Sequence, residues 1–171
     1  MPRRGEVIAV LGVVVFAVHS WSILGFLNKL SAFILYFRVA EIAEVFAFMM
    51  ATALLESLLI TAVLLLLSAL LPASWLRDGF AYKSFVVLLV LTGASIYLQQ
   101  VLRSSWPSIQ VLTNAWAAPL VGMVVIMALA HLVPRFKSIL LDVQDRLSIM
   151  LYVYIPLGVL SLFIVMFDFL L

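Results

Sequence analysis

Five long apolar runs constrain the fold of this chain more than any other feature. They cover residues 7–27, 45–71, 84–102, 115–133 and 147–171. A helix rises about 1.5 Å per residue, so about 20 apolar residues cross the roughly 30 Å hydrocarbon layer of a bilayer. We therefore predict an all-α integral membrane protein, with residues 1–171 forming one transmembrane domain. It would be a bundle of about five transmembrane helices joined by short amphipathic connecting helices.

The composition supports lipid as the solvent for this fold. Of 171 residues, 67% are hydrophobic and 11% are charged, whereas soluble domains average about 45–50% apolar and 25% charged residues. Cysteine is absent, which excludes disulfides and thiolate chemistry. The ten Lys and Arg residues are spread over several connections, so no nucleic acid partner is expected. The expected partners are the lipid bilayer and either further copies of the chain or a larger membrane complex.

Prolines and flanking charges set the expected ends of the spans. Arg3 and Arg4 precede the first run as in a signal peptide. The run has no small-residue cleavage triplet, so we expect a retained anchor. Proline removes an amide donor, so Pro72 and Pro134 are expected to end the second and fourth spans.

Two connections are expected to form helices at the membrane surface. Residues 28–44 carry four charges around an apolar block of five residues. That block is too short to span, which predicts an interfacial or re-entrant helix on the outer face. Residues 135–146 alternate apolar and charged positions at helical spacing, which predicts an amphipathic helix on the membrane surface.

The distribution of basic residues predicts the orientation. In a five-span arrangement, seven basic residues share a side with the N-terminus and three lie on the other side. By the positive-inside rule, the N-terminus is expected in the cytoplasm and the C-terminus outside the cell membrane. The seven are Arg3, Arg4, Arg77, Lys83, Arg135, Lys137 and Arg146, and the three are Lys29, Arg38 and Arg103.

Glu56 is the most informative ionisable residue because it falls inside the second apolar run. A charged side chain at this depth costs at least about 2.5–3.5 kcal/mol on insertion scales and usually faces protein or water. Counting 1.5 Å per residue places Glu56 about 16 Å below the outer end of its span and His19 about 20 Å above Glu6. We therefore predict an intramembrane polar site formed by His19, Thr52 and Glu56. His19 and Glu56 would lie within direct or one-water hydrogen-bond reach. The alternative is a protonated Glu56, or one hydrogen-bonded to Ser or Thr.

Two further carboxylates extend this polar face toward the outer surface. Glu41, Glu44, Thr52 and Glu56 fall within an arc of about 120° on a helical wheel. Glu41 and Glu44 could form an outer vestibule that attracts cations. The alternative is that both sit in water at the span end, with Arg38 pairing locally.

The remaining polar residues point to no specific chemistry. Asp168 and His131 are expected near span ends. A haem site would need His19 and His131 at one depth, but the five-span arrangement places them at different depths. A set of outer-half polar residues could line a cavity or bond between helices: Ser20, Ser22, Tyr97, Gln99, Gln100 and Asn114. Zinc-hydrolase, nucleotide-hydrolase and serine-triad motifs are absent from the sequence. We assign no catalytic residue, metal or cofactor.

Two classes of function follow as expectations. The first is a transport or permeation unit lined by Glu56. We expect it to be oligomeric, because the five short spans of one chain leave little room for a water-filled pathway within that chain. The second is a non-catalytic accessory subunit of a larger membrane complex. An intramembrane enzyme is a third reading that only a His19–Glu56 pair could support, so we do not expect an enzyme.

Overall fold

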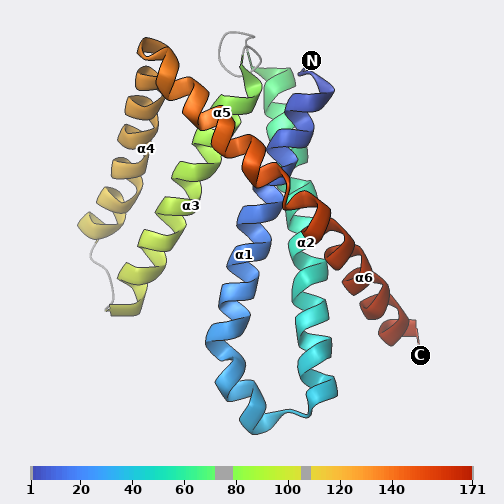
Figure 1. The fold of residues 1–171 in the computed structure, drawn as a ribbon. Coiled ribbons are helices and arrows are strands. Elements are labelled where there is room, and N and C mark those ends of the chain that lie inside the picture. The colour runs from blue at the N-terminus through green and yellow to red at the C-terminus, as the bar shows by residue number, and fades with distance from the viewer. Residues whose placement is uncertain (1, 72–78, 105–108, 171) are drawn as a thin grey trace.

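The computed structural model describes residues 2–71, 79–104 and 109–170. Within these ranges every element is a helix (Figure 1), in the order α1 (Arg4–Tyr36), α2 (Val39–Leu70), α3 (Phe80–Ser104), α4 (Ile109–Leu132), α5 (Pro134–Ser148) and α6 (Leu151–Leu170). Four of them, α1, α2, α3 and α6, are long and apolar enough to cross a membrane. A pair bent by 111°, Trp116–Ala130 with Pro134–Ser148, would be a fifth candidate. An all-α fold with several helices of spanning length is therefore confirmed.

The segment 28–44 does not form the separate helix that its charges predict. It is the end of one long hairpin, in which α1 continues to Tyr36 and α2 begins at Val39. The carboxylate of Glu41 accepts a hydrogen bond from the backbone N–H of Arg38 at 2.7 Å and so caps the start of α2. The charges therefore lie near a helix junction, where side chains satisfy free backbone groups, and do not mark a surface helix.

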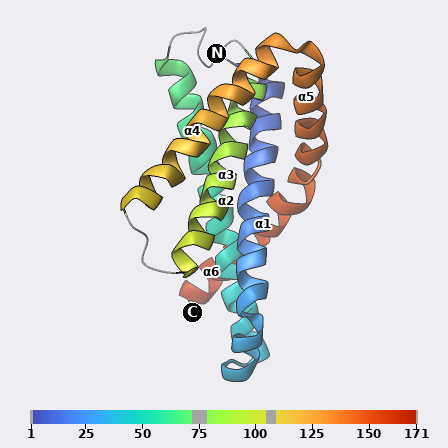
Figure 2. The same cartoon turned by 90° about the vertical axis from the view of Figure 1, so that its left-hand side faces the viewer.

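Helix α1 is the central element of the bundle. It packs against α2, α3, α5 and α6, and α2 packs in addition against α6. On the other side, α3 packs against α4 and α5. Helices α2 and α3 make little direct contact with each other. The hairpin end of α1 and α2 extends past the ends of α3 and α4 in both views (Figures 1 and 2). The molecule thus has two groups of helices joined through α1.

The charged connection 135–146 forms the helix predicted for it, α5, with Pro134 in its first turn. Leu140 and Gln144 on this helix are buried. Its C-terminal end approaches α1 closely: a Cβ added to Gly12 would lie 2.6 Å from the Ser148 Cα. Helix α5 therefore runs against α1 and α3. Its predicted place on a membrane surface stays a prediction.

Other element boundaries differ from the sequence pattern by a few residues. Helix α3 begins at Phe80, before the predicted span 84–102, and α4 begins at Ile109, before the predicted span 115–133. Gly79 precedes α3 with a φ of 79°, a left-handed conformation that glycine adopts without steric cost. Pro72, expected to end the second span, lies outside the described residues, and α2 ends at Leu70.

The two ends of the chain lie toward opposite ends of the bundle. The N-terminus is at the end opposite the α1–α2 hairpin, whereas the C-terminus lies toward the hairpin end (Figures 1 and 2). An odd number of crossings would produce this arrangement. Which end faces the cytoplasm stays a prediction.

Candidate functional site

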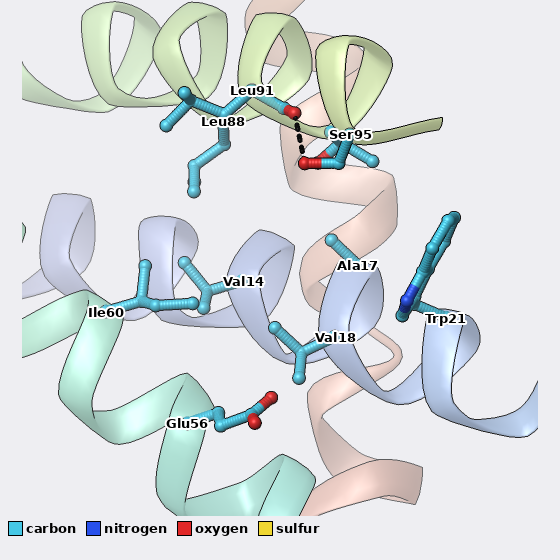
Figure 3. A pocket seen from close by; sticks show the side chains of 10 residues that line it. Val14, Ala17, Val18, Trp21, Glu56, Ile60, Leu88, Leu91 and Ser95 are labelled. Carbon is cyan, nitrogen blue, oxygen red and sulfur yellow. Dashed lines mark hydrogen bonds between the residues drawn. The ribbon is translucent and has the colours of Figure 1, made fainter. Parts of the chain in front are cut away.

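A hollow of about 280 Å³ lies between α1, α2 and α3, and Glu56 lines it. Figure 3 shows the Glu56 carboxylate beside Val18 of α1, with Leu88, Leu91 and Ser95 of α3 on the opposite side. Helices α2 and α3, which line two sides of this hollow, make little direct contact with each other. Glu56 is correspondingly exposed in the single chain.

One stripe of α1 forms the floor of this hollow and of a second one. The second hollow, of about 640 Å³, lies toward the hairpin and includes Asn28 and Lys29 of α1 and Gln99 of α3. Trp21 lines both hollows. The stripe follows helical spacing and comprises Val14, Ala17, Val18, Trp21, Leu24, Gly25 and Asn28. The two hollows thus follow one another along α1, from the hairpin side to Glu56, and share Trp21. We call the two hollows together the α1 groove.

The α1 groove is closed beyond Glu56 by the apolar core. Val10, Val14, Phe80 and Val86 are at most 1% exposed and belong to one cluster that joins α1 to α3. Leu64 of α2 packs into the same cluster. On the N-terminal side the groove therefore ends at well-packed apolar side chains.

Glu56 has no hydrogen-bond or ion-pair partner among the described residues. Its neighbours in the hollow are mostly apolar, with Thr92 and Ser95 of α3 as polar exceptions. The Ser95 hydroxyl already donates to the Leu91 carbonyl at 2.9 Å. A carboxylate in such surroundings either takes up a proton, binds a cation or meets a donor from another molecule.

His19 faces a different neighbour from Glu56. Its ring stacks on Tyr154 of α6, with centroids 5.2 Å apart, and Nδ1 lies 3.0 Å from the Val15 carbonyl oxygen. The other ring nitrogen, Nε2, is buried and has no hydrogen-bond partner in the described part of the chain. The predicted direct hydrogen bond to Glu56 is therefore wrong. A bond through one water stays a prediction.

Gly158 of α6 shows which part of α2 lies at the level of His19. A Cβ built on Gly158 would lie 3.3 Å from His19 Nε2 and 2.9 Å from the Cβ of Leu54, which is two residues before Glu56 in α2. His19 and the Glu56 region thus share a level in the bundle. Their side chains diverge because His19 points to α6 and Glu56 to the α1 groove.

The other predicted site residues take local roles or lie apart. The Thr52 hydroxyl donates to the Phe48 carbonyl of its own helix at 2.8 Å. Glu41 caps α2, in line with the local alternative to a vestibule. Glu44 lines a separate hollow of about 270 Å³ between α2 and α6, together with Asp168. None of these three residues joins Glu56 in the α1 groove.

The outer-half polar set is divided between different surroundings. Gln99 reaches the α1 groove, whereas the Ser20 hydroxyl lies 3.3 Å from the Tyr154 hydroxyl and so links α1 to α6. Tyr97 and Asn114 are exposed and Ser22 is half-buried. The side chains of Gln100 and His131 lie outside the described part of the chain.

Trp21, Lys29 and Ser95 are groove residues that sequence reasoning did not select. The spacing of Val14, Val18 and Trp21 could have indicated a common helix face. However, both faces of α1 are apolar, so spacing alone does not say which face is open. In the described residues, no group of three or more His, Cys, Asp or Glu side chains is arranged to hold a metal ion.

Comparison with known proteins adds no constraint on function. No protein-family model, curated protein or solved structure matches this chain.

Proposed function

We propose that this chain is a membrane-spanning permeation or transport unit in which Glu56 binds a proton or small cation. The observation that carries the proposal is an exposed carboxylate at the closed end of the α1 groove, without a partner among the described residues. Asn28, Lys29 and Gln99 give the hairpin side of the groove a polar lining, as expected where water enters. The cost of placing a carboxylate in hydrocarbon is avoided when water or protein fills the groove.

The proposed unit contains several copies of the chain. A single chain leaves Glu56 exposed. A neighbouring copy related by cyclic symmetry would cover the α1 groove and exclude lipid from Glu56. Each subunit would then contribute one carboxylate to the assembly.

A second candidate function is a non-catalytic subunit that receives a helix of another membrane protein. The apolar walls of the Glu56 hollow support this alternative, since Val18, Ile60 and Leu91 would suit a packed helix better than a column of water. Native mass spectrometry of the purified chain in nanodiscs separates the two candidates. A closed homo-oligomer supports the permeation unit, whereas a stable monomer supports the accessory subunit.

The flux test uses Glu56→Gln, which removes the charge and keeps the shape. Liposomes containing the wild-type chain should dissipate an imposed proton or potassium gradient, and Glu56→Gln should slow this flux about tenfold or more. Asp142→Asn is the matched control, because Asp142 is an exposed carboxylate on α5. Equal flux in Glu56→Gln and wild type would contradict the role of Glu56. If liposomes that contain the wild-type chain are no more permeable than protein-free liposomes, the chain does not conduct these ions and the permeation proposal is contradicted.

We further propose that the N-terminal end of the bundle faces the cytoplasm of the cell. The seven-to-three distribution of basic residues supports this orientation. A periplasm-active reporter fused after Leu171 should be active, and one inserted between Lys137 and Ser138 should be inactive. The reverse pattern would overturn the orientation and leave the flux test unaffected.

A further inference from the structure

The hollow that Glu56 lines combines one carboxylate with apolar and aromatic walls. Its walls are mainly valine, isoleucine and leucine side chains of α1, α2 and α3, together with the indole of Trp21 (Figure 3). Small-molecule sites in proteins are clefts of about 300–1,000 Å³ with mostly apolar walls and a few polar groups. This hollow, of about 280 Å³, lies at the lower end of that range, and the second hollow follows it along α1. Its lining is therefore that of a site for a small organic molecule.

The oxygen atoms around Glu56 are few for an inorganic metal ion. The lining residues offer one carboxylate and the hydroxyls of Thr92 and Ser95, whereas Mg²⁺ and Ca²⁺ take about six to eight oxygen ligands. The remaining ligands would be water molecules, which apolar walls do not hydrogen-bond. The walls therefore favour a cation whose own surface is apolar.

An organic cation with an apolar body matches each part of this hollow. Its positive charge would face the Glu56 carboxylate, which has no partner among the described residues. Its apolar body would displace water from side chains such as Val18 and Leu91. The Trp21 indole adds a face to which a cation is attracted by the ring quadrupole.

The charge that faces such a ligand is negative. Glu56 is the charged residue among the described side chains that line the hollow. Lys29 lines the second hollow and follows Val18 by eleven positions on α1, which is about 16 Å along the helix axis. Charges at this distance are largely screened at physiological salt, where the screening length is about 8 Å.

We propose that the Glu56 hollow binds an organic cation with an apolar body, such as an aromatic quaternary ammonium. Glu56 neutralises the charge, Trp21 stacks on the ligand, and the apolar walls of α1 and α3 hold its body. The inference rests on the part of the proposed function that makes Glu56 the cation-binding residue, but it does not require ion flux.

The test measures binding of radiolabelled benzyltrimethylammonium to the full chain in nanodiscs by equilibrium dialysis. Wild type should bind it saturably, and Glu56→Gln should weaken binding at least about tenfold, because it removes the only charge that pairs with the ligand. Trp21→Leu should weaken binding about fivefold through loss of the cation–π contact. Tetramethylammonium, which lacks the ring, should compete less well than unlabelled benzyltrimethylammonium, and potassium should compete least.

Three controls make the result specific. Asp142→Asn removes an exposed carboxylate of α5 and should bind as wild type does. Glu56→Asp keeps the charge and should bind more tightly than Glu56→Gln, which separates loss of charge from loss of folding. Neopentylbenzene, in which carbon replaces the charged nitrogen, should not displace the labelled probe.

Absence of saturable binding to wild type, equal binding to Glu56→Gln, or displacement by neopentylbenzene would each overturn the inference. Proton flux measured on the same preparations reports on the proposed function separately. Flux without binding contradicts the organic-cation site alone, whereas binding without flux contradicts permeation alone.

Discussion

Replacing Gly12 with alanine is expected to lower the free energy of unfolding by about 1–3 kcal/mol. The new Cβ would lie 2.6 Å from the Cα and 2.8 Å from the Cβ of Ser148. The nearest atom belongs to the backbone of α5, so no side-chain rotation relieves the overlap, and α5 must move away from α1. Denaturant titration in mixed micelles measures the loss.

The same substitution is expected to expose the buried side of α5. The sequence contains no cysteine, so a single cysteine introduced at position 144 reports on that side, where Gln144 is 1% exposed. Its labelling rate should rise when Gly12→Ala is added, whereas a cysteine at exposed position 145 should label equally in both backgrounds. A Cβ at Gly25 on the same helix meets nothing within 4 Å among the residues that the structure describes, so Gly25→Ala should be neutral or slightly stabilising. Equal stability of the Gly12 and Gly25 variants would contradict the close α1–α5 contact.

Gly158→Ala should destabilise the contact between α6 and α2 by a similar amount, about 1–3 kcal/mol. The added Cβ would lie 2.9 Å from the Leu54 Cβ and 3.3 Å from His19 Nε2. The imidazole is held between Tyr154 and the Val15 carbonyl, so it has little room to yield. The measurement is again the free energy of unfolding in mixed micelles.

Gly122→Ala on α4 is the matched control for Gly158, because a Cβ there meets no atom of the described residues within 4 Å. It should leave the unfolding free energy unchanged or slightly higher. A Gly158→Ala protein as stable as Gly122→Ala would mean that α6 does not pack against α2 as closely as described.

Hydropathy was sufficient to predict the helices but not the hairpin. An apolar run shows how many consecutive residues avoid water. The bounds of α2 and α6 could therefore be predicted to within a few residues at most of their ends. The charges of residues 28–44 were misinterpreted because hydropathy does not distinguish a surface helix from the polar end of a long hairpin. The Arg38–Glu41 cap, at a spacing of three residues, was the available signal for a helix start.

The candidate site shows a second limit of sequence reasoning. The positions of His19 and Glu56 could be counted along each helix, and in the structure His19 and Leu54 both lie beside Gly158. The direction in which their side chains point could not be obtained in this way. Helix α1 is apolar on all sides, so its sequence does not show how the helix is rotated about its axis. Gln144 illustrates the same limit, since it is a polar residue on an amphipathic helix and is nevertheless buried.

The position of α6 has a consequence for the order in which the protein is assembled during translation. Its contact with α2 joins residues about a hundred positions apart, as Leu54 and Gly158 show, and such distant contacts form late. The α1–α2 hairpin leaves the ribosome well before α6 is synthesised. At that stage the His19 ring lacks the Tyr154 ring that stacks on it in the finished fold. A nascent chain halted before residue 151 would therefore lack the Tyr154 ring that stacks on the His19 imidazole.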